Sequence, residues 1–323
     1  MTTGPDFRTA ELDRLAAQII PAEHFEFSAE TARDRFFKDT AMLDIKQLVH
    51  NRFRTNPLSM VDHMRDNLQL TGSEDLLDLG CGNAFVLEHL RPSLAGGSIT
   101  GLDNAPAVLD AARQRMRGTA TPCTWIEGSA DDLSMLRDDS FDRVMANYMI
   151  HYVPDLGACF REVRRVMRPG GIFQLTTDRP DSMLEMYEVH FTALTAMGAP
   201  ADLHRATPKG RLSLDNGRPQ LAGHFDTVET VTWQDQLRFT EPEPFMEFYR
   251  VGHNHCCASS EPDERLDEDF FTELRAKVRA QVVSAIEKHG TSPSRSSRVP
   301  SCAADELIGA RLDYRPLWPA RRW

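Results

Sequence analysis

The spacing of apolar residues changes twice along the chain. Over residues 8–70 apolar side chains recur at i, i+3 and i+4, as in ELDRLAAQII and MVDHMRDNLQL, which predicts amphipathic helices. From about residue 71 short apolar runs alternate with helical patterns, and this alternation predicts βαβ units around a parallel sheet. The alternation stops near residue 180, so helical and irregular chain flanks the sheet region on both sides.

The patterns can be assigned to individual elements. The predicted strands of the sheet read DLLDL, SITGLD, TWIEG, FDRVMAN and GIFQLTT. Helical patterns between them cover residues 84–94, 105–117, 131–136 and 156–167. Further along, helices are predicted over 181–200, 243–251 and 267–289, and a strand over 227–239. We therefore expect four segments: a helical N-terminal cap (1–70), a Rossmann-like core (71–180), a substrate roof with the C-terminal strand and helices of the core (181–290), and an irregular tail (291–323).

Composition narrows the function classes. The 323 residues carry 37 Lys and Arg against 48 Asp and Glu, a net charge of −11, which disfavours a nucleic acid as substrate because the surface repels phosphates. No apolar run approaches the roughly 20 residues that span a bilayer, and the start of the chain has no secretory pattern. Six scattered cysteines indicate reduced thiols, so we expect a soluble, cytoplasmic protein. The run His253–Cys257 lacks the spacing of a tetrahedral zinc site, and no metal is expected.

The candidate chemistry begins at the first predicted strand, which runs into the turn LLDLGCGNAF at residues 76–85. Gly80 and Gly82 remove side chains where a ligand can approach the backbone, and the following helix offers N–H groups to an anionic group. Asp103 ends the second strand, 21 residues after Gly82, where its carboxylate can accept hydrogen bonds from both hydroxyls of a ribose. An ordinary βα turn and a helix cap at Asp103 are the structural alternatives.

Five motifs in order over residues 72–178 resemble those of class I S-adenosylmethionine-dependent methyltransferases, in particular bacterial small-molecule enzymes of secondary metabolism. They are LLDLGCGNAF, GLDNAP, IEGSADDL, SFDRVMANYMIHYVPD and FREVRRVMRPGG. The resemblance implies an α/β fold with a doubly wound, mostly parallel sheet of the seven-stranded methyltransferase type, and a roof inserted after the fifth strand. It implies S-adenosylmethionine as cofactor, S-adenosylhomocysteine as product, and a small organic acceptor, with oxygen preferred over nitrogen or carbon.

The resemblance also assigns cofactor contacts by position. The residues expected to bind the cofactor are Asp78, Gly80, Cys81, Gly82, Asp103, Asn104, Ser129, Ala130, Asp131 and Asn147. The glycine turn would hold the methionine moiety, and the residues around 104 and 129 would flank the adenine. Because the family often has Asp where Ser129 stands, Asp131 is a candidate to take over that contact. Asn147 would lie beside the sulfonium and its amino group, unless it serves as a capping residue.

The candidates for substrate chemistry lie beyond the fourth strand. His151 titrates near neutrality and is the candidate general base, although packing and loop capping are alternative roles. The roof offers aromatic and imidazole side chains that fit either a pocket or a core: Tyr187, His190, Phe191, Phe245, Phe248 and Tyr249. The helix end at Arg52–Arg54 could cover the cofactor. The acceptor itself and the oligomeric state are not readable from these patterns.

Two rival functions stay open. A nicotinamide-dependent oxidoreductase would use Asp103, but its fingerprint needs a third glycine near position 85, where the chain has Phe85. A protein that binds S-adenosylmethionine without catalysing methyl transfer would keep the same motifs.

The tail has two explanations, natural divergence without stable order or a shifted reading frame. Relatives of this type tend to end with a strand like GTFxITKxxGxF, whereas this chain continues from Gly290-Thr291 into SPSRS. Codons such as TCA-CCA-TCA-CGA-AGC for that run spell Phe-Thr-Ile-Thr-Lys in a frame shifted by one nucleotide. Translating the gene in that frame tests the hypothesis.

Overall fold

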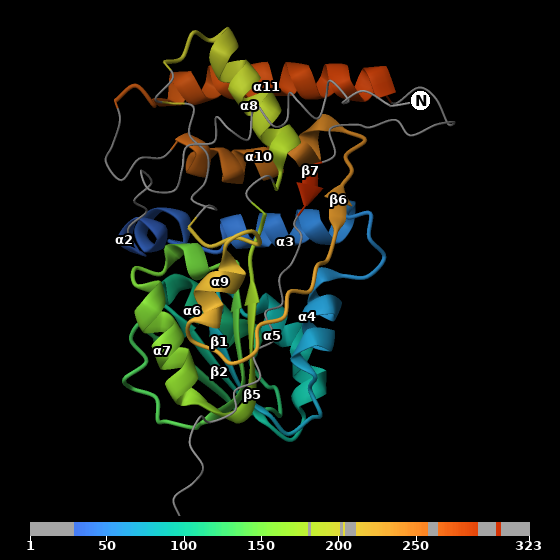
Figure 1. Ribbon diagram of the computed structural model, residues 1–323. Coiled ribbons are helices and arrows are strands. Elements are labelled where there is room, and N and C mark those ends of the chain that lie inside the picture. The colour runs from blue at the N-terminus through green and yellow to red at the C-terminus, as the bar shows by residue number, and fades with distance from the viewer. Residues whose placement is uncertain are drawn as a thin grey trace, which may run out of the picture.

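The computed structural model describes residues 29–179, 182–200, 203, 211–257, 264–289 and 302–304. A five-stranded parallel sheet with the order β3-β2-β1-β4-β5 forms its lower layer in Figure 1. The strands are β1 Asp75–Leu79, β2 Ser98–Asp103, β3 Cys123–Glu127, β4 Phe141–Asn147 and β5 Met167–Thr176. The strand order reverses between β1 and β4, and ligands of open α/β sheets bind at the carboxyl ends of the strands beside such a reversal.

Helices cover both faces of this sheet, which explains the nearly continuous apolar runs of its central strands. On one face Leu76 and Met145 pack into a core with α4 (Met60–Leu68), α5 (Phe85–Leu90) and α6 (Pro106–Arg115). On the other face Leu77 and Phe173 pack against α7 (Leu156–Val166) and α9 (Gly217–Ala222). Two short 3-10 helices, η3 (Arg91–Leu94) and η4 (Ile150–Tyr152), complete the connections.

A helical layer lies above the sheet. It consists of α8 (Leu184–Ala196), α10 (Pro242–Cys257) and α11 (Glu268–His289), which share an apolar core. Helix α3 (Ala41–Phe53) runs between this layer and the sheet, and its Val49 belongs to the upper core (Figure 1). Before α3 come α2 (Ala29–Thr31) and the π-helix η2 (Ala32–Phe36). We refer to α8, α10 and α11 as the roof.

The five predicted core strands are confirmed, whereas other predicted elements differ. Residues 131–136 form turns instead of a helix, and Asp131 accepts the N–H of Asp155 there. The strand predicted over 227–239 shrinks to β6 (Asp235–Leu237), which pairs with β7 (Cys302–Ala304) and not with the sheet. Among the described residues no sixth or seventh strand joins the five, so the seven-stranded detail and the four-segment division stay predictions.

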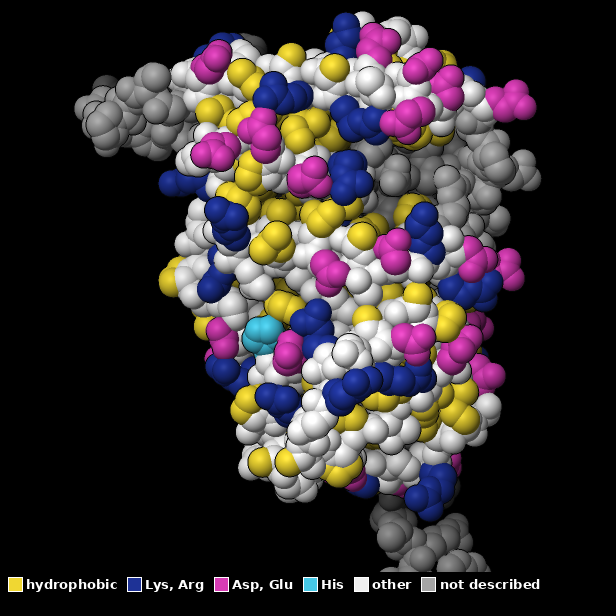
Figure 2. Space-filling model, turned by 180° about the vertical axis from the view of Figure 1, so that it is seen from behind, with side chains coloured by type: hydrophobic (Ala, Val, Ile, Leu, Met, Phe, Trp, Pro, Cys, Tyr) yellow, Lys and Arg dark blue, Asp and Glu magenta, His cyan; other side chains and the backbone are white. Residues whose placement is uncertain are grey.

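Several expectations fall on other parts of the chain. Two segments lie outside the described residues: residues 1–28 and the tail after residue 289, apart from β7. The frameshift hypothesis concerns this tail, so the structure does not test it. β7 gives regular structure to three residues of a tail predicted to be irregular. Where helices are described, none combines the length and apolar character needed to cross a membrane. Acidic and basic side chains are interspersed over the face shown in Figure 2.

Candidate cofactor and substrate site

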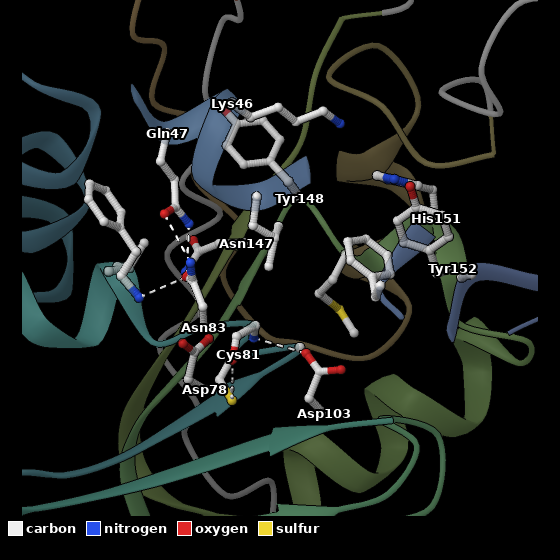
Figure 3. Close-up of a pocket in the computed structure, with 18 of the residues that line it drawn as sticks. Lys46, Gln47, Asp78, Cys81, Asn83, Asp103, Asn147, Tyr148, His151 and Tyr152 are labelled. Carbon is white, nitrogen blue, oxygen red and sulfur yellow. Dashed lines mark hydrogen bonds between the residues drawn. The ribbon is translucent and has the colours of Figure 1, made fainter. Parts of the chain in front are cut away.

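A cavity of about 350 Å³ lies where the carboxyl ends of β1, β2 and β4 meet α3 and the roof. Its volume falls within the usual range of small-molecule sites. Ten of the predicted site residues line it: Asp78, Gly80, Cys81, Gly82, Asp103, Asn104, Ser129, Ala130, Asn147 and His151. The close-up in Figure 3 shows Asp78, Cys81 and Asp103 at the sheet side, with Lys46 and Gln47 of α3 above them.

The turn after β1 needs its glycines. Gly80 and Gly82 have φ values of +66° and +53°, a region that side chains disfavour. A Cβ on Gly80 would also lie 2.7 Å from Cβ of Met149. The N–H of Cys81 donates to the carbonyl of Leu102 at 3.0 Å, which fixes the turn against the end of β2. The turn is therefore held in one conformation beside the cavity.

Asp103 binds two backbone segments beside the cavity but does not cap α6, whose N-cap is Ala105 and which has no side-chain cap. Its carboxylate accepts the N–H of Ala105 at 3.0 Å, just before α6, and the N–H of Gly82 at 2.9 Å. The side chain of Asn83 similarly accepts the N–H of Phe85 at 3.3 Å. The N–H groups of Gly82 and Phe85, which the sequence offered to an anionic ligand, thus already bind side chains of the protein.

Asp78 is the most unusual group in the cavity. It is only 2% exposed, and its Oδ1 has no hydrogen-bond partner among the described residues. Burial, reinforced by the negative charge of Asp103, raises the pKa of Asp78 well above its ordinary value. Burial also raises the pKa of Asp103, against the opposing effect of its N–H bonds. A buried and a half-buried carboxyl group in one cavity favour a ligand that brings positive charge and N–H donors.

Asn147 presents a donor to the cavity. Its Oδ1 accepts the hydroxyl of Thr176 at 2.8 Å, whereas its Nδ2 has no hydrogen-bond partner among the described residues. The sequence places Asn147 beside the cofactor's amino group, which would need an acceptor. A buried N–H donor suits an oxygen atom of a ligand better.

Asp131 is the predicted site residue that does not line the cavity. Its Oδ1 accepts the hydroxyl of Ser129, and its Oδ2 accepts the N–H of Asp155 at 3.1 Å. These bonds tie the turn after β3 to the start of α7. Asp131 therefore holds Ser129 and Ala130 in place and does not face the cavity as a substitute for Ser129.

His151 lies in η4 on the side of the cavity away from Asn83 (Figure 3). Its ring is 4.3 Å from that of Tyr152, centroid to centroid, and Tyr152 in turn packs edge-on against Phe37 of the segment after η2. The histidine is thus half-buried in an aromatic wall. That position is within reach of a ligand and is compatible with either predicted role.

Helix α3 contributes a face of the cavity that the sequence analysis missed. Its lining residues are Leu43, Lys46, Gln47, His50, Asn51 and Arg54. Their spacing of three or four residues along a predicted helix was the available signal, but only Arg52–Arg54 drew attention. Arg54 does line the cavity, whereas Arg52 is exposed and lies over the Phe53 ring.

Asn83 fastens α3 to the glycine turn (Figure 3). Its amide accepts from Gln47 Nε2 at 2.9 Å and donates to Asp44 Oδ1 at 2.8 Å, and Asn83 is 1% exposed. Three partners, namely the Gln47 amide, the Asp44 carboxylate and the N–H of Phe85, therefore meet at one buried amide. We call this set of contacts the Asn83 latch.

The roof's candidate side chains belong to or contact the upper core, and two of them also line the cavity. Tyr187 and Phe248 line the cavity, joined by Trp233 from the irregular chain before β6. The other four candidates pack only in or against the upper core; they are His190, Phe191, Phe245 and Tyr249. Within this core His190 Nδ1 lies 2.7 Å from the hydroxyl of Tyr249. The side chains of His253–Cys257 lie outside the described residues, and the described ones hold no cluster of three or more metal-ligating groups.

Comparison with known proteins agrees with this geometry. A family model described as a methyltransferase domain matches residues 77–175. A malonyl-[acyl-carrier protein] O-methyltransferase of Legionella pneumophila is 37% identical over 112 residues, which cover 34% of this chain and 38% of that protein. A ubiquinone biosynthesis O-methyltransferase of Xanthomonas oryzae is 31% identical over 122 residues, 38% of this chain and 49% of that protein. The chain thus matches less than half the length of either relative.

Solved structures extend the likeness in fold to most of the chain. The [4+2]-cyclase SpnF superposes with a TM-score of 0.54 at 16% identity, covering 92% of this chain and 99% of that one. The YcgJ protein from Bacillus subtilis superposes with a TM-score of 0.50 at 15% identity, covering 79% and 98%. Over residues 77–175, the chain therefore contains a methyltransferase domain.

Proposed function

We propose that this protein transfers a methyl group from S-adenosylmethionine to an oxygen atom of a small organic acceptor. The observation that carries the proposal is the buried carboxyl group of Asp78, with the half-buried Asp103 also lining the cavity, beside the glycine turn. Asp78 Oδ1 has no partner among the described residues, so a cationic ligand with N–H donors would satisfy it. S-adenosylmethionine brings a sulfonium and an ammonium group, and the residues present fit it.

The same features disfavour a nicotinamide dinucleotide. A pyrophosphate needs free N–H groups at the start of the helix after β1. Here the N–H groups of Gly82 and Phe85 bind Asp103 and Asn83. Asp78 and Asp103, whose pKa values burial raises, would also offer it no positive charge. The polarity of the cavity therefore favours the methyltransferase over the oxidoreductase.

Each cofactor contact then has a proposed role. Asp78 would accept from the ammonium group, and Asp103 would accept from the ribose hydroxyls with the lone pairs that its N–H bonds leave. Asn104, Ser129 and Ala130 would border the adenine. Gly80, Cys81 and Gly82 would lie behind the methionine chain. When bound, the cofactor supplies an activated methyl group on a positively charged sulfur.

The chain's own contribution is alignment and exclusion of water. Helix α3, fastened by the Asn83 latch, and the roof enclose the cavity above the sheet. Holding two reactants in line can contribute about 7–11 kcal/mol, so a base is needed only where the acceptor must lose a proton. His151 is the candidate for that base.

Oxygen is the proposed methyl-accepting atom for two reasons. The two relatives above are named as O-methyltransferases, and the unpartnered Nδ2 of Asn147 can donate to an acceptor oxygen. The cavity's size and the net charge of −11 support a small molecule and not a nucleic acid. A role in bacterial secondary metabolism is proposed from the motif resemblance. A cytoplasmic location is proposed because Cys81, Cys123 and Cys159, the cysteines whose side chains the structure describes, are free thiols.

Turnover tests the proposal. Purified protein is incubated with S-adenosylmethionine carrying a labelled methyl group and a pool of phenols, carboxylic acids and amines. We expect label in a phenol or a carboxylic acid, together with release of S-adenosylhomocysteine, and loss of both in Asp78→Asn. Label only in amines would contradict oxygen transfer. Tight cofactor binding without any transfer would favour a binding protein without methyltransferase chemistry.

A further inference from the structure

The chain directly after β4 has a backbone conformation that bulky side chains disfavour. Tyr148 follows Asn147 there, and its φ is +54°. A large residue in this left-handed region is a rare outlier that persists only where the surrounding structure enforces it, and such outliers cluster at ligand-binding sites. Tyr148 is therefore held, at a cost in stability, where a glycine or an asparagine would fit more easily.

Four other residues besides the glycines have a positive φ within the part of the chain that the structure describes: Gln69, Ala84, Asp139 and Met183. Gln69 ends α4, and Asp139 lies in the turn before β4, which are ordinary places for this conformation. Of the five, Tyr148 and Met183 line the cavity. The two outliers with large apolar side chains thus lie at the candidate site.

Hydrogen bonds enforce the backbone at Tyr148. Its N–H donates to the carbonyl of Thr176 at 3.0 Å, and the hydroxyl of Thr176 donates to Asn147 Oδ1 at 2.8 Å. Thr176 is fully buried at the end of β5. These bonds join the carboxyl ends of β4 and β5, so the pair Asn147-Tyr148 cannot turn away from the cavity without breaking them.

The Tyr148 ring forms part of the cavity wall. It is half-buried and packs against Met64 of α4 and Trp233, both of which also line the cavity. The indole N–H of Trp233 donates to the carbonyl of Leu58 at 3.2 Å, which fixes the indole. Figure 3 shows Tyr148 between Asn147 and α3. A supported aromatic ring therefore borders the cavity beside the Asn147 amide.

From this placement we propose that Tyr148 determines the specificity for the acceptor by packing against a flat aromatic ring of that molecule. The proposal rests on the proposed methyl transfer. Stacked and edge-to-face ring pairs attract each other beyond the burial of their areas, so a saturated ring of equal size would bind more weakly. Asn147 Nδ2, which has no hydrogen-bond partner among the described residues, would donate to an oxygen that this ring carries. One rigid dipeptide would thus supply both the ring contact and the oxygen contact.

The test compares two probes with the same carbon skeleton and hydroxyl group: 2-naphthol, which is flat and aromatic, and decahydro-2-naphthol, which is saturated. Each is titrated by calorimetry into protein saturated with S-adenosylhomocysteine. We expect 2-naphthol to bind about three- to tenfold more tightly. Tyr148→Leu should abolish this preference, because leucine keeps apolar bulk without a flat face. Tyr148→Phe is the matched control and should retain the preference, because it keeps the ring.

A second variant, Tyr148→Asn, should lose the preference in the same way, because asparagine adopts the left-handed backbone readily but has no ring. The prior titration with S-adenosylhomocysteine separates the two hypotheses, since failure of the unmodified protein at that step contradicts the proposed function itself. Unchanged affinity of a variant for S-adenosylhomocysteine shows that the variant is folded and that its cofactor site is intact.

Other outcomes overturn the proposal. Equal or tighter binding of decahydro-2-naphthol, or no binding of either probe to the loaded protein, would exclude recognition of a flat ring by this wall. Equal losses of affinity for both probes in Tyr148→Leu would reduce the side chain to apolar filling. Loss of the preference in Tyr148→Phe would assign the effect to the hydroxyl group. Loss of S-adenosylhomocysteine affinity in both Tyr148→Leu and Tyr148→Asn would assign Tyr148 to the cofactor site or to the fold.

Discussion

Replacing Asp78 by asparagine should stabilise the cofactor-free protein and weaken cofactor binding. The carboxyl group is 2% exposed and its Oδ1 has no partner among the described residues, so without a ligand burial opposes its ionisation at a cost in stability. Asparagine keeps the shape and removes the charge. If Asp78 only supported the fold, the same substitution would lower the stability of the protein. A rise in stability together with a loss of cofactor affinity therefore identifies a binding group.

The magnitude follows from the missing partner. A buried polar group without a hydrogen bond costs about 1–3 kcal/mol, and more when charged, so we expect Asp78→Asn to raise the free energy of unfolding by about that amount. A hydrogen bond to a charged group contributes about 1.5–3 kcal/mol, which corresponds to a loss of about 10- to 150-fold in affinity for S-adenosylhomocysteine.

The pH dependence of the stability provides a second test of the role of Asp78. Because burial raises the folded-state pKa of Asp78 above its ordinary value, the folded state holds a proton that the unfolded state has released. Stability contributed by the protonated carboxyl is present below the ordinary pKa of 3.8 and is lost as the pH rises toward the raised folded pKa. The advantage of Asp78→Asn should therefore grow as the pH rises from 3.8 toward the raised folded pKa, by at most about 1.4 kcal/mol per unit, and should then level off.

Urea unfolding of both proteins at several pH values, with and without S-adenosylhomocysteine, measures these effects. Asp103→Asn is the matched control. Asp103 accepts two backbone N–H groups, and its replacement should destabilise the glycine turn. A less stable Asp78→Asn protein at pH 7 without ligand, or unchanged ligand affinity, would refute the reasoning.

Three further variants test other parts of the site. Asn83→Ala breaks the latch and should cost about 2–4 kcal/mol in urea unfolding, since three hydrogen bonds to a buried amide are lost; unchanged stability would contradict the latch. Gly101→Ala places a Cβ 2.5 Å from the Trp125 ring and should destabilise the protein by about 1–3 kcal/mol, whereas full stability would mean that the ring moves freely. His151→Gln should lower turnover less than tenfold if alignment dominates; a loss of about 100-fold or more would identify a general base.

The sheet and the cofactor side of the cavity were predictable because their signals are local. DLLDL and FDRVMAN are apolar runs that end at Asp78–Leu79 and Asn147, so the parallel topology brings their carboxyl ends to one edge. The positive φ values of Gly80 and Gly82 explain why those positions read as a ligand turn. Each of these features is encoded within about ten residues of sequence.

Other parts of the site depend on contacts between distant segments. The Asn83 latch joins residues 36 and 39 positions apart, and nothing in the spacing of Asp44 and Gln47 identifies Asn83 as their partner. Asp131 satisfies its charge on Ser129 and Asp155, which a local motif comparison cannot foresee. Aromatic residues of the roof have the same spacing whether they face a core or a cavity.

Binding of the cofactor is the most direct test of the central claim. S-adenosylhomocysteine is titrated by calorimetry into the purified protein, with NAD and Asp103→Ala as controls, and circular dichroism verifies that each protein is folded. We expect saturable one-to-one binding of S-adenosylhomocysteine, much weaker binding in the variant, and no heat with NAD. Binding of NAD in preference to S-adenosylhomocysteine, or no binding by a well-folded protein, would contradict the assignment of this cavity to S-adenosylmethionine.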